Sequence, residues 1–161
     1  MEEREDSFIY EKGKQGIKYM TEQAKVEYYQ ISVGFEFQPH TYLLDSSVVS
    51  LYLEAVKETN AIFQKEGLVP PMAVTALAMS TLSQSVTMPS GTIHVSQELE
   101  FLKFVKVGDT ITCHSKVSRK VERGGLRLVN TDITVLNQNQ ETVLTGRVGF
   151  VLPEPSNTNS Q

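Results

Sequence analysis

The order of apolar and polar residues along the chain predicts a strand and a helix in its first third. From Phe35 to Leu44 the two kinds of residue alternate, as they do in a half-buried strand. The next residues, Asp45-Ser46-Ser47, are good N-caps for a helix. Apolar residues then recur at helical spacing, at Val48, Leu51, Tyr52, Ala55 and Val56.

A second helix is predicted to begin at about Pro71, a position where the missing N–H of proline has no cost. Its apolar residues cover nearly the whole circumference: Met72, Val74, Ala76, Leu77, Met79, Leu82 and Val86. Such a helix is buried on most sides. We therefore expect Met72, Leu77, Met79 and Leu82 to be largely buried.

After "TMPSG" the pattern changes to a period of two residues, which predicts long strands. The four segments are "GTIHVSQELEFLKFV", "GDTITCHSKVSRKVER", "GLRLVNTDITVL" and "ETVLTGRVGFVL". Hairpin-type turns separate them at Val107-Gly108-Asp109, Gly124-Gly125 and Asn137 to Gln140. The predicted fold class is α+β, with a long antiparallel sheet of five or six strands around one buried central helix and a smaller helix beside it.

This pattern defines one domain, from residue 31 to residue 153. Residues 1–30 are charged and polar without a clear period, and we interpret them as a loosely attached extension, helical around Tyr19 to Tyr28. The tail at residues 154–161 has the composition of a disordered segment.

Composition and charge exclude several classes of function. The chain has 161 residues, 40% of them hydrophobic, and a net charge of −4 without runs of Lys and Arg, which argues against nucleic-acid binding. Its apolar runs are too short to span a membrane, and the start "MEEREDSFIY" is unlike a signal peptide. One cysteine, Cys113, excludes an internal disulfide. These features predict a cytoplasmic protein.

The order of elements resembles the hot-dog fold, and the details resemble the MaoC-like (R)-specific enoyl-thioester hydratases and dehydratases. The segment "GTIHVSQELEFLKFVKVGDTIT" carries a Q-x-x-x-F strand followed by V-G-D, as in that family. The predicted helix "PPMAVTALAMSTL" matches the central helix of the family in position and composition. The resemblance covers Ile31 to Pro153. It implies an acyl thioester of coenzyme A or of acyl carrier protein as ligand, without a further cofactor.

The resemblance also implies where catalysis would occur. Active members carry D-x-N-P-x-H, whose Asp and His handle the water and the α-proton when water adds to an enoyl thioester. The matching residues run from Glu58 to Phe63, so that the acid and Asn60 are kept while a phenylalanine stands at the histidine position. Phenylalanine has no proton to transfer, and the resemblance therefore implies a degenerate catalytic pair.

A second difference concerns the start of the central helix. Members of the family commonly begin this helix with H-G-M, and the N–H of the glycine stabilises the enolate oxygen. Aligned on Met72, Pro70 and Pro71 occupy the His and Gly positions, and proline has no N–H. The resemblance places Phe63, Pro71, Met72, Lys103 and Lys106 beside the ligand.

Each candidate also has an ordinary structural interpretation. Glu58 is a general acid or base, or an exposed carboxylate at a helix end. Asn60 is a catalytic neighbour or a turn residue, and Phe63 lines the core or a pocket. His94 is a replacement base, or a histidine on the wetter face of the sheet, which its alternation with Ile93 and Val95 favours.

Other groups suggest less specific roles. His40 and His114 have no neighbours at metal-ligand spacing, so no metal site is predicted, and Cys113 fits a buried structural thiol. Basic residues near the strand ends fit either coenzyme A phosphates and acidic carrier proteins or solvated strand edges. They are Lys103, Lys106, Arg119, Lys120, Arg123 and Arg127.

Three functions remain open from the sequence. The first is an acyl-thioester-binding protein with a degenerate site, acting as a homodimer or as a heterodimer with a catalytic MaoC-like subunit. The second is an active hydratase or dehydratase with a site rearranged around Glu58 and His94. The third, a hot-dog thioesterase, is disfavoured because the central helix offers only Thr, Ser and Gln as polar groups.

Overall fold

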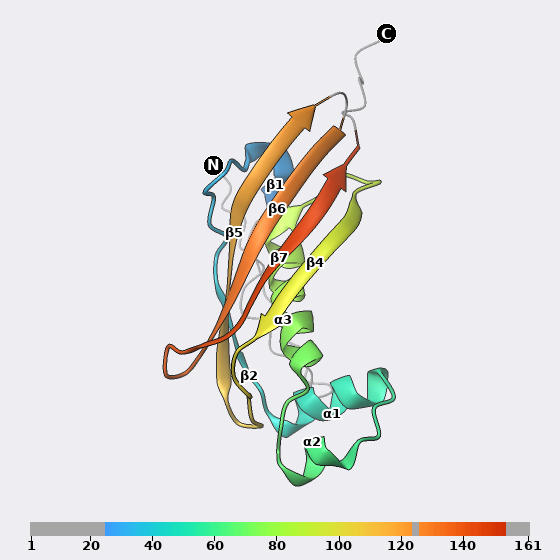
Figure 1. The fold of residues 1–161 in the computed structure, drawn as a ribbon, viewed down its shortest axis with the longest axis vertical. Coiled ribbons are helices and arrows are strands. Elements are labelled where there is room, and N and C mark those ends of the chain that lie inside the picture. The colour runs from blue at the N-terminus through green and yellow to red at the C-terminus, as the bar shows by residue number, and fades with distance from the viewer. Residues whose placement is uncertain (1–24, 124–125, 154–161) are drawn as a thin grey trace, which may run out of the picture.

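A five-stranded sheet forms the body of the protein in the computed structural model, which describes residues 25–123 and 126–153. All neighbouring strands of this sheet are antiparallel, in the order β2-β5-β6-β7-β4 (Figure 1). Their bounds are β2 His40–Leu43, β4 Ile93–Phe101, β5 Thr110–Arg123, β6 Leu126–Asn137 and β7 Thr142–Leu152. The predicted α+β class and antiparallel hairpins are confirmed. The first predicted strand, Phe35 to Leu44, is regular only over β2, although Glu36 also pairs with Lys116 of β5.

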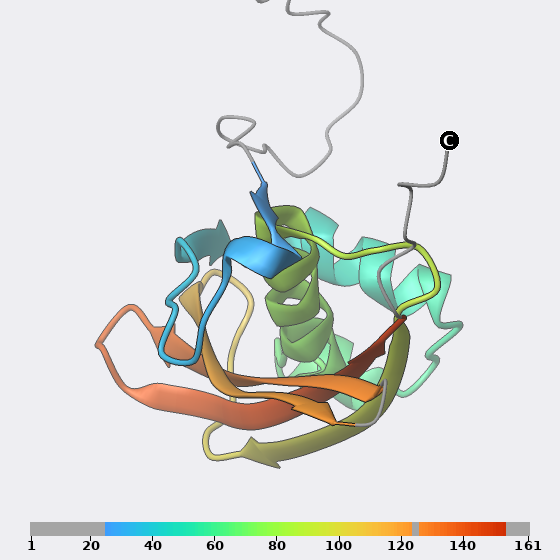
Figure 2. The same cartoon turned by 90° about the horizontal axis from the view of Figure 1, so that it is seen from above.

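The central helix α3, Pro71–Ser85, lies in the concave face of this curved sheet (Figure 2). Alternate residues of β5 and β6 are buried on that inner face: Ile111, Cys113, Ser115, Val117, Val129, Thr131, Ile133 and Val135. Leu77 and Leu82 are buried as predicted, and Met79 is half-buried. The prediction for Met72 is wrong, because its side chain is 49% exposed. Met72 lies in the first turn of α3, where the helix emerges from the sheet.

Two shorter helices precede α3, and side-chain caps begin both. Asp45 caps α1, Ser46–Ala55, by accepting hydrogen bonds of 2.9 Å from the N–H groups of Ser47 and Val48. This confirms the predicted cap and helix. The second helix, α2 (Ala61–Lys65), was not predicted from the sequence. Helices α1 and α2 lie together at the end of the molecule where α3 begins (Figure 1).

The first described residues form extended structure and a turn. Strand β1, Val26–Glu27, pairs in parallel with β3, Val86–Thr87, at the end of α3, and a 3-10 turn η1 follows at Tyr28–Gln30. The predicted helix is therefore wrong for its last residues, and the remainder lies outside the described residues. Tyr28 accepts a hydrogen bond of 2.7 Å from Arg127, and the Lys120 ammonium lies 5.2 Å from its ring centre. The predicted tail at residues 154–161 also lies outside the described residues.

Within the described ranges, no helix is both long and apolar enough to span a membrane.

A row of alternating charges crosses the outer face of the sheet, the face turned away from α3. Each member lies directly opposite the next on the neighbouring chain segment. We call these five residues the outer charge row: Glu36, Lys116, Asp132, Arg147 and Glu98. Lys116 is 2.9 Å from Glu36, and Arg147 binds both oxygens of Asp132 at 2.7 and 3.2 Å.

The outer charge row predicts a dependence of stability on acid. The hydrogen bond from Arg147 lowers the pKa of the Asp132 carboxyl, and a hydrogen bond from Ser118 lowers it further. A carboxyl with a lowered pKa stabilises the fold above its ordinary value of about 3.9, and the contribution is lost as the pH falls through the lowered value. Asp132→Asn should therefore unfold at lower urea than wild type at pH 7, with a difference that shrinks steadily below about pH 4. A difference of the same size at both ends of the pH series would contradict the assignment.

Candidate functional site

An apolar cavity of about 120 Å³ opens where α3 begins. It lies between the first turns of α3, the segment that follows β4, and the start of β7. Nine of its ten lining residues are apolar and the tenth is a lysine, so the cavity suits a hydrocarbon group better than a charged one. They are Val69, Pro71, Val74, Phe101, Leu102, Lys103, Phe104, Val105, Val143 and Leu144.

Backbone hydrogen bonds hold the start of α3 against this segment. The N–H of Val69 donates to the carbonyl of Val105 at 2.9 Å, and the N–H of Val107 donates to the carbonyl of Gly67 at 2.8 Å. Gly67 has a φ of +62°, a left-handed conformation that glycine adopts without the cost borne by other residues. The turn at Gly67 therefore aligns residues 67–69 with residues 105–107 and positions Pro71 at the cavity.

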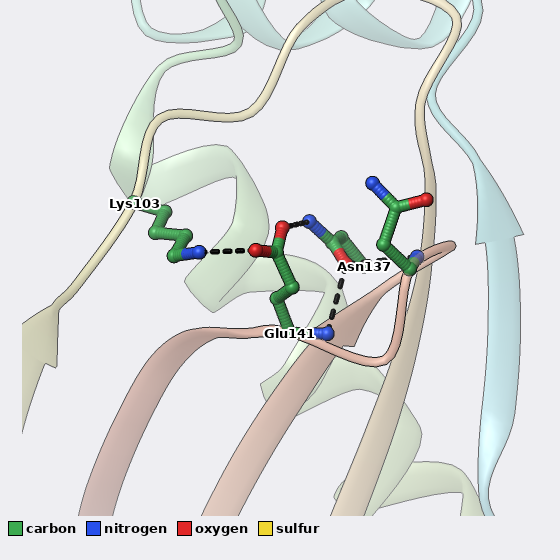
Figure 3. A network of polar contacts seen from close by, with 4 residues as sticks. Lys103, Asn137 and Glu141 are labelled. Carbon is green, nitrogen blue, oxygen red and sulfur yellow. Dashed lines mark hydrogen bonds and ion pairs between the residues drawn. The ribbon is translucent and has the colours of Figure 1, made fainter.

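A polar network holds the one charged residue of the cavity lining (Figure 3). The Lys103 ammonium forms an ion pair with the Glu141 carboxylate, which also accepts a hydrogen bond of 2.9 Å from the Asn137 side chain. Asn137 in turn accepts hydrogen bonds from the N–H groups of Asn139 and Glu141, which shape the turn between β6 and β7. The hydrogen bond from Lys103, and then the one from Asn137, lower the pKa of Glu141, which favours its charged form.

Glu58 and Asn60 build the start of α2. The Glu58 carboxylate accepts a hydrogen bond of 2.7 Å from the N–H of Asn60. The Asn60 side chain is the N-cap of α2 and accepts a hydrogen bond of 3.1 Å from the N–H of Ile62. Both residues are exposed, and neither lines the cavity. Their catalytic roles stay predictions, and the geometry gives each of them a local structural role.

Pro71 is the only one of the three predicted ligand contacts on α2 and α3 that lines the cavity. Phe63 is half-buried on α2 and Met72 is exposed on α3. Pro71 is the first residue of α3, so the helix has no N–H at that position. The next N–H, that of Met72, has no backbone acceptor within the described part of the chain.

The two predicted lysines lie on the same connection between β4 and β5. Lys103 lines the cavity, whereas Lys106 lies in the turn beyond it with an exposed side chain. The N–H of Lys106 donates to the Asp109 carboxylate at 2.8 Å, which closes this turn. Only Lys103 is therefore placed to contact a group inside the cavity.

His94 lies far from the cavity along β4. It pairs with Phe150, and residues opposite each other in a ladder share a face, so His94 is on the inner face rather than the wetter outer one. Its ring centre is 5.0 Å from that of Phe150, and its Nε2 is 2.9 Å from the Ser96 carbonyl. Phe101 at the other end of β4 lines the cavity. The two residues are seven steps apart along the strand, roughly 23 Å at about 3.3 Å per step.

The remaining candidates occupy ordinary positions. Burial raises the pKa of the Cys113 thiol to about 12, which suits a structural thiol. His114 lines a shallow hollow of about 600 Å³ on the outer face, together with Lys116, Asp132 and Thr134. Among the described residues, no group of three or more His, Cys, Asp or Glu side chains is arranged to hold a metal ion.

Most of the cavity residues were not predicted from the sequence. They come from the start of α3, from the end of β4 with the connection after it, and from the start of β7, segments that are distant in sequence and that only the fold brings together. One signal was present in the segment "FLKFV", where the adjacent apolar residues Phe101 and Leu102 break the alternation of a strand. Leu102 and Phe104 are 47% and 83% exposed, so the cavity has two apolar side chains at its edge that are accessible to solvent.

Comparison with known proteins gives a family and a set of similar folds. The family model described as "FAS1-like, dehydratase domain region" matches residues 31–146. A search of curated proteins found no match. Among solved structures, the unliganded R-hydratase PhaJ1 from Pseudomonas aeruginosa has a TM-score of 0.67 and 21% identity, over 79% of this chain and 85% of that one.

Two similar structures are complexes from Mycobacterium tuberculosis. The HadBC complex, a 3R-hydroxyacyl-ACP dehydratase, gives a TM-score of 0.61 and 22% identity over 74% of this chain and 96% of that one. The ChsH1-ChsH2 complex gives a TM-score of 0.62 and 15% identity, over 75% of this chain and 98% of that one. These identities show a shared fold, and the family match covers well over half of the sequence. The predicted hot-dog fold and MaoC-like relationship are confirmed. The chain therefore belongs to the family of FAS1-like dehydratase domain regions.

Proposed function

We propose that this protein binds an acyl thioester of coenzyme A or acyl carrier protein and does not hydrate it unaided. The observation that carries the proposal is the lining of the cavity at the start of α3, which is apolar except for Lys103. Hydration needs a titratable acid or base within hydrogen-bonding reach of the reacting atoms. The Lys103 ammonium already has the Glu141 carboxylate as its partner.

The residues that match the catalytic motif support the same proposal. Glu58 and Asn60 are engaged with backbone N–H groups at the start of α2, and Phe63 has no proton to transfer. Pro71 has no N–H with which to stabilise a developing enolate oxygen. The chain thus keeps an apolar binding site while the positions for acid–base and oxyanion groups hold residues unsuited to those roles.

The size of the cavity indicates the kind of acyl group. A cavity of about 150 Å³ is large enough to hold benzene. The present cavity, at about 120 Å³, accommodates an acyl group of a few carbons. Phe104 and Leu102 are exposed at its edge and become buried when such a group enters. Lys106, exposed on the same connection, is available to the phosphates of the carrier.

We further propose that catalysis occurs in a pair with a second chain that carries an intact Asp and His. The HadBC and ChsH1-ChsH2 structures are complexes of related fold, which makes a two-chain arrangement the natural precedent. In such a pair this chain supplies the acyl site, and its partner supplies the proton-transfer groups.

Butyryl-CoA should raise the melting temperature of the protein, whereas free coenzyme A should raise it less. At about 100 times the Kd the stabilisation is about 2.7 kcal/mol, or roughly 5–10 °C for a chain of this size. Leu102→Ala with Phe104→Ala removes two side chains of the lining and should weaken the binding about tenfold. Thermal melts across a butyryl-CoA titration measure both effects.

The matched control is Leu51→Ala, which truncates a leucine of α1 that is 58% exposed and outside the cavity. It should leave butyryl-CoA binding unchanged. Equal shifts with butyryl-CoA and free coenzyme A, or an unchanged affinity in the double variant, would contradict an acyl site at this cavity.

A second candidate function is an active dehydratase whose site combines Glu58 of one chain with His94 of another. The observation in its favour is that His94 lies on the inner face of an edge strand, where a partner chain would contact it. The same chain cannot supply both groups, because β4 begins at the end of the molecule opposite α1 and α2 (Figure 1).

A further inference from the structure

Strand β4 is an open edge of the sheet. It pairs with β7 on one side, and within the described residues no strand pairs with its other side (Figure 1). All of its residues are exposed except Leu99, which is half-buried. An open edge of nine residues presents a row of free N–H and C=O groups to which another strand can add.

The outer charge row ends at this edge without a final partner. Glu98 lies opposite Arg147 and attracts it, but Arg147 binds both oxygens of Asp132. Glu98 forms no ion pair within the described part of the chain. Across the sheet the charges alternate from negative to positive and end on the negative Glu98. The position beyond it, on a strand added to β4, therefore favours a positive side chain.

A second copy of the chain does not supply this positive side chain. In an antiparallel pair, opposite residues lie on the same face, which restricts how β4 can pair with its own copy about a two-fold axis. An axis at Glu98 or at Glu100 places that carboxylate against itself, and an axis at Leu99 places Glu98 against Glu100.

An axis at Gln97 is the remaining arrangement near the middle of β4. It avoids the carboxylate pairs, but it brings the β-bulge between His94 and Ser96 into the pairing. A bulge interrupts the ladder, so only Ser96 to Glu98 would pair regularly. Self-pairing therefore opposes like charges or leaves a short ladder.

We propose that β4 docks an edge strand of a different chain, one that carries Lys or Arg opposite Glu98 and Glu100. On the inner face the partner strand has apolar residues opposite Leu99 and Phe101. Leu99 is half-buried and Phe101 is 43% exposed. The proposal rests on the proposed role as one member of a two-chain dehydratase, and it names the edge and the chemistry that select the partner. The carboxylates of Glu98 and Glu100 thus favour a basic partner strand and disfavour pairing with a second copy of the same chain.

The charge selection can be tested with the protein itself as the probe. A Glu98→Lys, Glu100→Lys variant presents the basic edge that wild type is proposed to prefer. In a mixed pair of one wild-type chain and one variant chain, with the axis at Leu99, Glu98 of wild type faces the lysine at position 100 and Glu100 faces the lysine at position 98. Sedimentation of wild type, variant and their equimolar mixture should show the mixed pair about tenfold tighter than either self-pair.

The control variant is Glu54→Lys, Glu66→Lys, which changes the net charge by the same amount at exposed residues of α1 and of the end of α2. Its mixed pair with wild type should be no tighter than the wild-type self-pair. The proposal would be overturned if the mixed pair were no tighter than the wild-type self-pair, or if the control variant gained as much affinity on mixing. It would also be overturned if no sample formed pairs. Butyryl-CoA binding is measured separately, so a failed acyl site and a failed partner edge give different results.

Discussion

The purified protein should hydrate crotonyl-CoA more slowly than an active hydratase of this fold by a factor of about 10³ or more. An acid–base group contributes about 10²–10⁴ to such a reaction, and one oxyanion donor about 10²–10³. The chain has Phe63 at the position of the catalytic histidine and Pro71 at the position of the oxyanion donor. The two losses do not simply multiply, because groups that act as a unit lose activity together. The decrease in enoyl absorbance measures the rate directly.

Restoring the missing groups tests the physical reason. Phe63→His with Glu58→Asp returns an imidazole and a carboxylate to the motif positions, and activity should rise above that of wild type. Adding Pro71→Gly returns an N–H at the first turn of α3 and should raise it further. The matched control is Phe63→Leu with Glu58→Asp, which removes the aromatic ring without adding a proton donor. If Phe63→His with Glu58→Asp were no more active than this control, more than the Asp and His pair would be missing.

Robust turnover by wild type would contradict the prediction and favour the second candidate function. Glu58→Gln and His94→Gln would then identify which residue had taken over. If the site combines groups from two chains, each variant alone should be inactive, and mixing the two should recover part of the activity. A residue that acts only within its own chain would give no recovery on mixing.

The sequence predicts the parts of this fold that depend on local pattern. The caps and apolar spacing of α1 and the period-two strands with their turns follow from neighbouring residues, and the structure has them. Helix α2 was missed because five residues are too few to show a period. Its signal was the Asn60 cap, which the sequence also allows as a catalytic neighbour.

Two residues show where local pattern is insufficient. Met72 belongs to a helix that is apolar nearly all round, and such a pattern does not say which turn emerges from the sheet. His94 precedes a β-bulge, and its face depends on the pairing with β7 rather than on its immediate neighbours. Both are properties of packing between elements that are distant in sequence.

The cavity and the outer charge row depend on the same long-range packing. Each is assembled from segments that the sheet aligns, and the register decides which side chains meet. Glu98 illustrates this point, because its meaning comes from Arg147 on β7 and from the open side of β4. From the sequence alone it is one of many charged residues in an alternating strand.

Truncation of Leu82 to alanine should remove about 2–5 kcal/mol from the free energy of unfolding. Leu82 lies on α3 in the hydrophobic core and is 2% exposed, so the substitution leaves a cavity that its neighbours fill only in part. Leucine and alanine are both good helix formers, so the loss reports packing rather than helix propensity. Because domains are typically stable by about 5–15 kcal/mol, this single change removes a large share of the total.

Leu51→Ala is again the matched control, since it makes the same substitution on a helix at a side chain that is 58% exposed. It should change the free energy of unfolding by no more than about 0.5 kcal/mol. Urea unfolding of the three proteins measures both values, and similar m-values would show that the unfolded states are comparable. If the two alanine variants lose similar amounts, α3 is not the packed centre of the fold. A large difference between them would instead tie the stability of the domain to α3, the helix whose first turns line the proposed acyl site.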